Sequence, residues 1–600
     1  MQDWTQDVEQ VELFVRRSQA AGVNRRTFMK ILASTSAALA LAACAPVPSA
    51  QPAASSGAAA APADAAKAGA AVPDAEQVFR TPTDAEPASH DFNKDLYCGG
   101  NAQLFAGLTV FDKDYKPQPY VAEKWELNDK GDVYTFHLKP GQKWTNGDPV
   151  TAHDFEWSFK RQLDPATQAS YAAFLFDLKN AEAFNTKKEG VKADDVGVKA
   201  KDDLTLEITL EGPRGYFLTV LAYAAALPAH RGAVEKFGDK WTEAGNIVTN
   251  GPWKLTTWEH EKQLVYERNE DFVLTPKPKL RKIVSPIIAT EAQLAAYEAG
   301  EIDRALAPLA ELKRLQADEK LAKEIHQFSQ TGAFYLAPAY SQKPFDVKEV
   351  RLALNHAVDR ESLVKTVLQG IGQPAYTFGP PDAPGYLDPA KYPWVKELTE
   401  YNPQKALDLL KGTPYEGGKN WPEVTLTYRN DELAGLPGLA AQAIQSFLKQ
   451  NIGLEIKLEA LEGKAFRAKM WAHKIQLTYV RWYMDYPDPN NNFFFDWYSS
   501  RSSGSRHEYK DAEFDKIVVQ AAGENNWDKR LELYVEAEKR MLEDGAATYV
   551  YYPFGIRVYK SWVQGLPVNS NGLPVQDWNI YSGLTQEVYI ADAPDRPKLS

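Results

Sequence analysis

The densest group of chemically useful side chains is the segment Arg481–Pro489, with the sequence RWYMDYPDP. It holds a guanidinium, two carboxylates and three aromatic rings within nine residues. A carboxylate such as Asp485 can pair with a cation that leaves water, a transfer that otherwise costs several kcal/mol. Other roles stay open from the residues alone. Asp485 can cap the turn before the prolines, Arg481 can pair with Asp488 on the surface, and the rings can pack in a core.

No familiar catalytic motif accompanies these carboxylates. The sequence lacks His-Glu-x-x-His, Gly-x-Ser-x-Gly and a complete phosphate loop. Asp485 and Asp488 resemble a glycosidase pair in type, but their spacing says nothing about the separation that such chemistry needs. His260 and His507 each precede a glutamate without a second histidine nearby, so we expect both on solvated surface. We predict that the protein is not an enzyme and has no catalytic residue, metal site or cofactor, with a secreted hydrolase as an alternative.

The first 44 residues are typical of an export signal rather than of a folded element. The pair Arg25 and Arg26 is followed by an uncharged apolar run at 31–43, and then by Cys44. This run is shorter than the roughly 20 residues that a spanning helix needs and has the length of a signal-peptide core. The sequence Leu-Ala-Ala-Cys that ends at Cys44 resembles a lipobox. We therefore predict a twin-arginine lipoprotein signal at 1–44, export as a folded chain, and acylation of Cys44.

The composition divides the rest of the chain into a spacer and a large folded body. Residues 45–75 are dominated by alanine and proline and cannot bury enough apolar surface to fold, so we predict a tether. The whole chain has 600 residues, of which 44% are hydrophobic, 12% aromatic and 25% charged, enough for several cores. Its formal charge of −12 argues against a nucleic-acid binder. With Cys44 acylated, Cys98 is the only other cysteine, so no internal disulfide is expected.

Strand and helix patterns alternate through the folded body and must position these groups. Alternating apolar residues predict strands at 133–139, 204–210, 264–268, 425–428 and 454–458. Helical spacing predicts helices at 152–159 behind the N-cap Thr151, at 350–363 and at 439–450. The last helix lies between two of the strands, which is a β-α-β pattern. The class is therefore mixed α/β with two or more lobes.

Four long blocks of this body carry a family resemblance: residues 122–155, 235–252, 350–360 and 509–515. The first contains the turn TNGDPVTAHDF, and the second contains EKFGDKW and GNIVTNGP. In order and in spacing the blocks resemble family 5 of the bacterial extracellular solute-binding proteins, which serve peptide importers of the ABC type. The resemblance covers residues 80–600 and is greatest to the oligopeptide-binding branch.

The resemblance implies a type II periplasmic-binding-protein fold. Two lobes joined by a hinge are expected, and an extra domain enlarges one of them to give three domains. We expect lobe 1 (domain I) from residues 76–105, 231–329 and 554–600. Residues 106–230 would form domain II, and residues 330–553 would form lobe 2 (domain III).

The resemblance also implies a ligand site around Asp485. In peptide-binding relatives the acid at this position pairs with the α-ammonium of the peptide. Expected aromatic contacts are Trp482 and Tyr483, beside that acid, and Tyr171, from the opposite lobe. Arg481 stands where close relatives carry glycine, so it could pair either with a ligand carboxylate or with Asp488.

The implied activity is that of a receptor without catalysis. A peptide that bridges both lobes stabilises the closed form, because it has extra affinity for that form. The expected partners are the transmembrane subunits of an ABC permease with their ATPase, and the membrane through the Cys44 lipid. The protein would act outside the cytoplasm as a monomer, and we do not expect it to bind nucleic acid. Other solutes of this fold stay as alternatives: oligosaccharides, opines, haem or nickel complexes.

Overall fold

The computed structural model describes residues 69–95, 103–431, 435–499, 506–570, 572, 574–575 and 586–596. The predicted export pair Arg25 and Arg26, the predicted acylation site Cys44 and the second cysteine, Cys98, lie outside the described residues. Within the described ranges, no helix combines the length and the apolar character needed to cross a bilayer.

The end of the predicted tether belongs to the folded body. Ala71 forms a bridge with Ala591, and the Val72 N–H donates to the carbonyl of Ile590 at 3.0 Å. Val72 is also buried. The predicted boundary at residue 75 is therefore wrong by several residues, because pairing with a distant strand is not visible in the composition of a segment.

A four-stranded sheet in the order β4-β5-β7-β6 forms the centre of residues 106–230. Its strands are β4 (Ala122–Leu127), β5 (Val133–Leu138), β6 (Val198–Asp202) and β7 (Thr205–Thr209), and the helices of this part are α3 (Ala152–Leu163), α4 (Ala181–Asn185) and α5 (Phe217–Leu221). Helix α3 begins behind Thr151, whose N–H donates to the Asp154 carboxylate at 2.8 Å in a capping box. The predicted N-cap and the strands at 133–139 and 204–210 are confirmed.

A second four-stranded sheet, β1-β10-β9-β8, joins the beginning of the described chain to residues far along it. Its strands are β1 (Val78–Arg80), β8 (Trp253–Glu259), β9 (Gln263–Arg268) and β10 (Lys282–Pro286). Strands β2 (Thr109–Phe111) and β3 (Pro117–Pro119) belong to residues 106–230, where β2 contacts α5 and β3 contacts β4. The other elements of residues 231–329 and 554–600 include α6 (Arg231–Phe237), α7 (Thr290–Glu298), α8 (Leu309–Ala317), α9 (Leu321–Glu324), β20 (Val563–Gln564) and β21 (Tyr589–Ile590). The predicted strand at 264–268 is β9.

A six-stranded sheet in the order β14-β18-β13-β17-β15-β16 lies within residues 330–553. Its strands are β13 (Gly332–Pro338), β14 (Gln373–Pro374), β15 (Val424–Arg429), β16 (Ile456–Leu461), β17 (Leu477–Tyr483) and β18 (Thr548–Tyr552). The α-helices of this part are α10 (Lys348–Ala357), α11 (Arg360–Ser362), α12 (Pro393–Thr399), α13 (Pro403–Leu409), α14 (Leu436–Ile452), α15 (Gly463–Trp471), α16 (Pro489–Asn492), α17 (Ala512–Gly523) and α18 (Trp527–Glu543). Strands β15 and β16 are parallel with α14 between them, which confirms the predicted β-α-β unit.

The helix predicted over 350–363 is wrong in its extent. Helix α10 ends at Ala357, and Asp359 begins α11 by accepting the Ser362 N–H at 2.9 Å. Arg360 is 1% exposed and donates to main-chain carbonyls from distant segments, among them those of Ala375 and Tyr549. Satisfying this buried guanidinium fixes the chain in a break that helical periodicity does not predict.

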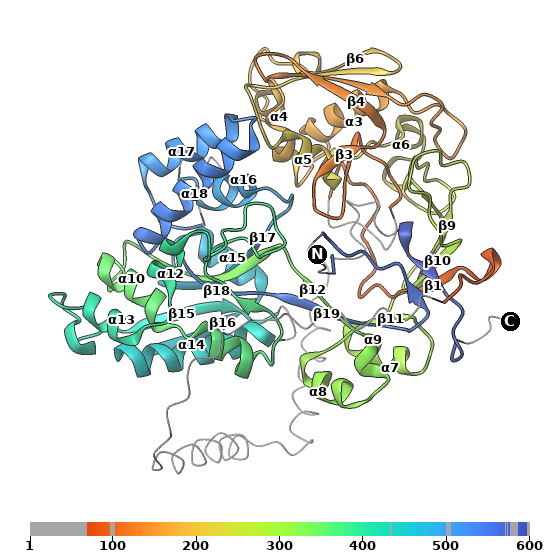
Figure 1. Ribbon diagram of the computed structural model, residues 1–600. Coiled ribbons are helices and arrows are strands. Elements are labelled where there is room, and N and C mark those ends of the chain that lie inside the picture. The colour runs from red at the N-terminus through yellow and green to blue at the C-terminus, as the bar shows by residue number, and fades with distance from the viewer. Residues whose placement is uncertain are drawn as a thin grey trace, which may run out of the picture. The chain divides into compact units, whose positions relative to one another are not determined.

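Two strands connect the parts of the molecule. Strand β12 (Ile325–Ser329) precedes the six-stranded sheet, and β19 (Phe554–Tyr559) follows it; both lie in a three-stranded sheet with β11 (Arg304–Leu306). The Gln330 N–H donates to the Pro553 carbonyl at 3.1 Å, so the two crossing points are adjacent (Figure 1). We propose that this is the hinge, and that the three larger sheets mark lobe 1, domain II and lobe 2 with the boundaries given above, except that lobe 1 includes Ala71 and Val72.

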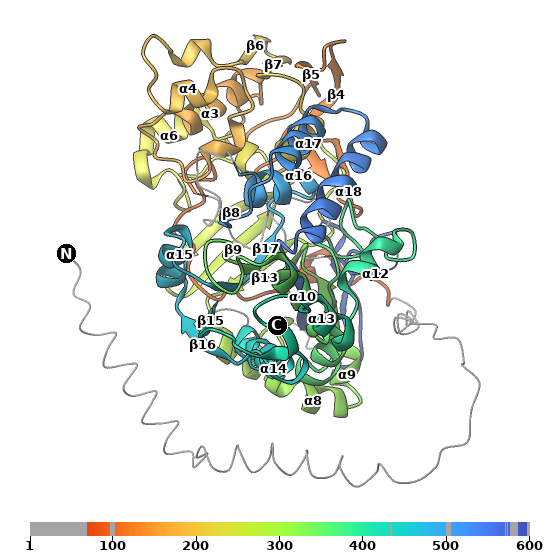
Figure 2. The same ribbon diagram turned by 90° about the vertical axis from the view of Figure 1, so that its left-hand side faces the viewer.

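Domain II also meets the far end of lobe 2, where α16 and α17 border it (Figure 2). The Gly215 N–H donates to the carbonyl of Ala522 in α17 at 3.0 Å. A Cβ at Gly215 would lie 2.0 Å from the Glu524 carbonyl oxygen, so this approach needs glycine. The hydrophobic cluster that contains the buried residues of domain II and part of lobe 1 accordingly includes Tyr486 and Ala522 of lobe 2.

Candidate ligand-binding site

Three of the predicted site residues, Arg481, Trp482 and Tyr483, lie at the end of β17 and divide between the two faces of its sheet. Arg481 pairs with Phe334, which belongs to one core cluster, whereas Trp482 pairs with Ala333, which belongs to another. Successive residues of a strand point to opposite faces. Arg481 and Tyr483 therefore share one face, and Trp482 lies on the other.

Arg481 contacts an aromatic ring rather than Asp488. Its guanidinium carbon lies 4.1 Å from the centroid of the Tyr483 ring, a cation–π contact. Asp488 is buried and pairs with Arg530, whose Nη2 lies 2.9 Å from Asp488 Oδ2. Burial raises the pKa of Asp488, and the charge of Arg530 opposes that rise. The alternative pairing of Arg481 with Asp488 on the surface is therefore wrong.

Asn491 joins Trp482 to Asp485. Its Oδ1 accepts the Trp482 indole N–H at 2.8 Å and the Asp485 N–H at 3.1 Å. Its Nδ2 donates to the Asp485 carboxylate at 3.3 Å. Asn491 is fully buried, whereas Trp482 and Asp485 are half-buried. One amide thus orients both the aromatic ring and the carboxylate of the predicted site.

Asp488, and not Asp485, caps the helix that follows. The Asp488 carboxylate accepts the Asn490 N–H at 3.0 Å and caps α16. Asn491 was not predicted, although the run of three asparagines after Pro489 marks an unusual concentration of amides. Nothing in that run distinguishes the one amide that bonds to Asp485.

Aromatic contacts connect this segment to domain II. The Tyr486 ring is stacked on Tyr216, with centroids 5.9 Å apart and planes 8° apart, and meets Phe174 edge-on at 5.9 Å. Phe174 in turn stacks on Tyr171 at 5.3 Å. Asp485 therefore lies next to a contact between lobe 2 and domain II. Tyr171 is connected to Tyr486 through the ring of Phe174.

A buried polar network lies behind Trp482 and was not predicted. The Tyr335 hydroxyl donates to Asp496 at 2.5 Å and lies 2.9 Å from His507 Nε2. His507 is 5% exposed and stacks on Trp497 at 4.2 Å, so its predicted place on the surface is wrong. Although burial raises the pKa of Asp496, His507 and Arg506 lower it below its usual value. His260, by contrast, is exposed as expected.

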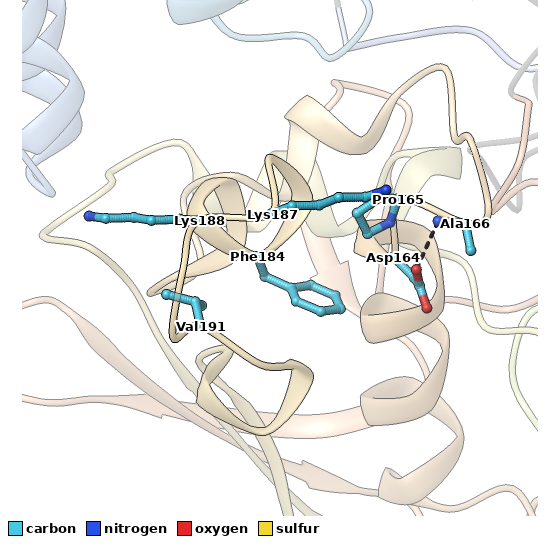
Figure 3. A pocket seen from close by; sticks show the side chains of 7 residues that line it. All are labelled: Asp164, Pro165, Ala166, Phe184, Lys187, Lys188 and Val191. Carbon is cyan, nitrogen blue, oxygen red and sulfur yellow. Dashed lines mark hydrogen bonds between the residues drawn. The ribbon is translucent and has the colours of Figure 1, made fainter.

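A separate hollow on domain II contains none of the predicted site residues (Figure 3). It has a volume of about 310 Å³ and is lined by Asp164, Pro165, Ala166, Phe184, Lys187, Lys188 and Val191. Lys188 extends away from the Phe184 ring, and the Asp164 carboxylate is occupied by the Ala166 N–H at 2.8 Å (Figure 3). In the part of the chain that the structure describes, no group of three or more His, Cys, Asp or Glu side chains could hold a metal ion.

Comparison with known proteins identifies the family. The model of the family described as "Bacterial extracellular solute-binding proteins, family 5 Middle" matches residues 116–504. The chain belongs to this family. Its fold is that of the type II periplasmic binding proteins, and the family is one of solute-binding proteins.

Several curated relatives cover most of the chain. The dipeptide-binding protein DppE of Bacillus subtilis is 33% identical over 503 residues, which are 82% of this chain and 89% of DppE. The periplasmic oligopeptide-binding protein OppA of Salmonella typhimurium is 35% identical over 472 residues, 77% of this chain and 84% of OppA. The probable deoxycholate-binding periplasmic protein YgiS of Escherichia coli is 30% identical over 529 residues, 86% of this chain and 94% of YgiS.

Solved structures of the family superpose on the chain. The unliganded open form of the periplasmic murein tripeptide-binding protein MppA matches with a TM-score of 0.72 at 27% identity, covering 88% of this chain and all of MppA. OppA of Haemophilus influenzae in complex with the peptide RPPGFSPFR matches with a TM-score of 0.63 at 26% identity, covering 86% of this chain and 99% of that one. These matches extend the family likeness to both lobes.

Proposed function

We propose that this protein is the substrate-binding receptor of an ABC importer and that it captures peptides between its two lobes. The observation that carries the proposal is the placement of Asp485. Its half-buried carboxylate is oriented by Asn491 and precedes Tyr486, which packs against domain II. A peptide enclosed there would bring an α-ammonium out of water, and a fixed carboxylate offsets that cost.

Aromatic side chains and main-chain groups would make the other contacts. Trp482, Tyr483 and Tyr171 are the proposed ring contacts. An extended peptide can also form main-chain hydrogen bonds with exposed backbone of the protein, and these bonds do not depend on the side chains of the peptide. Ligand side chains can then lie among water molecules, so we expect a broad range of peptides.

The test is the variant Asp485→Asn, measured by calorimetric titration with short peptides that have a free amino terminus. We expect a loss of about 3–5 kcal/mol, which is more than a hundredfold in affinity, because the α-ammonium loses its anionic partner. Asp346→Asn, an exposed aspartate of lobe 2, is the matched control and should bind as the wild type does. An unchanged affinity for the Asp485→Asn variant would refute the peptide assignment.

Export and anchoring form the second part of the proposal. Arg25 and Arg26 would direct export, and a lipid on Cys44 would hold the monomer at the outer side of the cell membrane beside its permease and ATPase. The supporting observations are the order of these motifs in the sequence and the extracellular character of the family. Metabolic labelling with a fatty acid should mark the wild type and not Cys44→Ser; equal labelling of the two would contradict the anchor.

A non-peptide solute is the second candidate, because YgiS matches a larger share of this chain than the peptide-binding relatives do. A ligand without an ammonium would gain nothing from the charge of Asp485. Titration with deoxycholate separates the two candidates. Saturable binding that Asp485→Asn leaves unchanged, together with no binding of peptides, would favour this second function.

A further inference from the structure

A second arginine lies on the face of Trp482, in a place that neither the motifs nor the proposed function uses. The guanidinium carbon of Arg506 is 4.3 Å from the centroid of the Trp482 ring. Its Nη1 donates to the main-chain carbonyl of Arg481 at 3.5 Å. Trp482 therefore has a cation on its face, while its indole N–H shares Asn491 with the Asp485 carboxylate. Arg506 thus lies on the face of this ring, and Asp485 is linked to the edge of the ring through Asn491.

Arg506 is held from the protein interior. Its Nε lies 3.5 Å from Oδ1 of Asp496, whose side chain is fully buried and accepts a hydrogen bond from Tyr335. An arginine that is already fixed loses little rotamer freedom when it binds a ligand. The Asp496 side chain is fully buried, whereas the Arg506 side chain is 24% exposed, so a ligand can still reach the guanidinium.

Within the described part of the chain, Nη2 of Arg506 makes no hydrogen bond or ion pair. The contacts described above use Nε and Nη1. A planar guanidinium can give two parallel N–H groups to a carboxylate, which is a stronger contact than one between neutral groups. Arg481 and Trp482 lie on opposite faces of the sheet. The arginine that contacts the Trp482 ring is therefore Arg506 and not Arg481.

We propose that Arg506 binds a carboxylate of the ligand and that Asp485 and Arg506 together select peptides with a carboxylate close to their amino end. The inference rests on the proposed function, since it needs the ammonium to lie at Asp485. The Trp482 ring and the Asn491 amide lie between the two charged groups, so we expect the ammonium and the carboxylate of the ligand to be a residue or two apart. The carboxylate can come from an acidic side chain or from the carboxyl terminus of a very short peptide.

Two pairs of peptides distinguish these sources by calorimetric titration. The first pair is Ala-Glu-Ala-Ala amide and Ala-Gln-Ala-Ala amide, which differ only in a side-chain charge. The second is Ala-Ala-Ala with a free carboxyl terminus and its amide. We expect the wild type to bind the carboxylate member of at least one pair about tenfold more tightly. No preference in either pair would overturn the inference.

The variant Arg506→Gln assigns the preference to its residue. We expect it to bind both members of the pair within about twofold of each other, at the affinity that the wild type has for the amide member. Arg467→Gln, which removes an exposed arginine of α15, should keep the wild-type preference. A preference that survives in Arg506→Gln would overturn the inference.

A conservative variant covers the case in which Arg506→Gln does not fold because Asp496 loses its partner. Arg506→Lys keeps a positive charge near Asp496 but lacks the paired N–H groups. It should lose most of the preference, and full retention would contradict the proposal. Binding of all four peptides without preference would overturn only this inference, whereas binding of none would also remove the proposed function.

Discussion

Asp485 and Asp488 are three residues apart in the sequence but differ in burial and in their bonding partners. Asp488 is buried, pairs with Arg530 and caps α16, so its role is structural. Asp485 is half-buried and held by the Asn491 amide beside domain II, which suits a group that receives a ligand. A third acid, Glu538 of α18, is buried with one hydrogen bond, from the Phe378 N–H at 2.7 Å.

The buried carboxyl of Glu538 should make the stability of the protein depend on pH. Burial raises its pKa from 4.5 to about 8. Between these values the folded protein keeps the proton that the unfolded chain releases, so this group lowers the free energy of unfolding as pH rises, by up to about 1.4 kcal/mol per pH unit. Glu538→Gln should remove this fall in denaturant titrations between pH 5 and 8. The exposed Glu536→Gln should keep it, and identical pH profiles for wild type and Glu538→Gln would contradict the prediction.

At the scale of elements, the position of the site depends on how closely β13 and β17 approach. Gly332 pairs with Tyr483, and a Cβ at Gly332 would lie 1.9 Å from the Trp482 carbonyl oxygen and 2.7 Å from the Tyr483 ring. The absence of a side chain at Gly332 therefore lets the end of β17 lie flat against β13. That end carries Trp482 and leads directly into Asp485.

Gly332→Ala should displace the end of β17 and disturb the site. We expect a loss of about 1–3 kcal/mol in the free energy of unfolding, typical of overpacking, together with weaker peptide binding. Chemical denaturation and calorimetric titration measure the two effects. Gly212→Ala is the control, because the nearest atom to its Cβ is 3.6 Å away. If Gly332→Ala matched this control in both measurements, the close approach would not matter.

At the scale of the whole folded body, two kinds of contact connect the lobes. At the proposed hinge, β12 pairs with β19 in one sheet, and the Gln330 N–H donates to the Pro553 carbonyl. A second contact, from Tyr216 and Gly215 to Tyr486 and Ala522, joins domain II to lobe 2. A ligand at Asp485 would lie beside this second contact, so its binding should change the balance between open and closed arrangements.

Ligand binding should therefore be visible in the global properties of the protein. A peptide at a hundred times its dissociation constant should add about 2.7 kcal/mol to the free energy of unfolding. Small-angle scattering should show a smaller radius of gyration in the presence of peptide. Asp485→Asn at the same peptide concentration should show neither effect. Stabilisation of the wild type without compaction would contradict lobe closure while leaving peptide binding intact.

Much of the local structure and the family were predictable from the sequence. The capping box at Thr151, the strands at 133–139 and 204–210 and the β-α-β unit around α14 follow from residue patterns that act over a few positions. Asp485 and Trp482 are predicted site residues because the family resemblance covers the segment in which they stand. The helix break at Asp359 and the burial of His507 could not be predicted, since both depend on partners far along the chain.

The sequence alone determined what neighbouring residues decide, namely element types, caps and the class of fold, and it led to the prediction of a site at β17 and the turn that follows it. Only the tertiary structure decided which side chains meet there. It placed Trp482 and Arg481 on opposite faces, assigned Asp488 to Arg530, and brought Asn491 and Arg506 to the same ring. The physical reason is that charge pairing and hydrogen bonding depend on distance in space, and the distances that matter here are set by strands and helices that pack from separate parts of the chain.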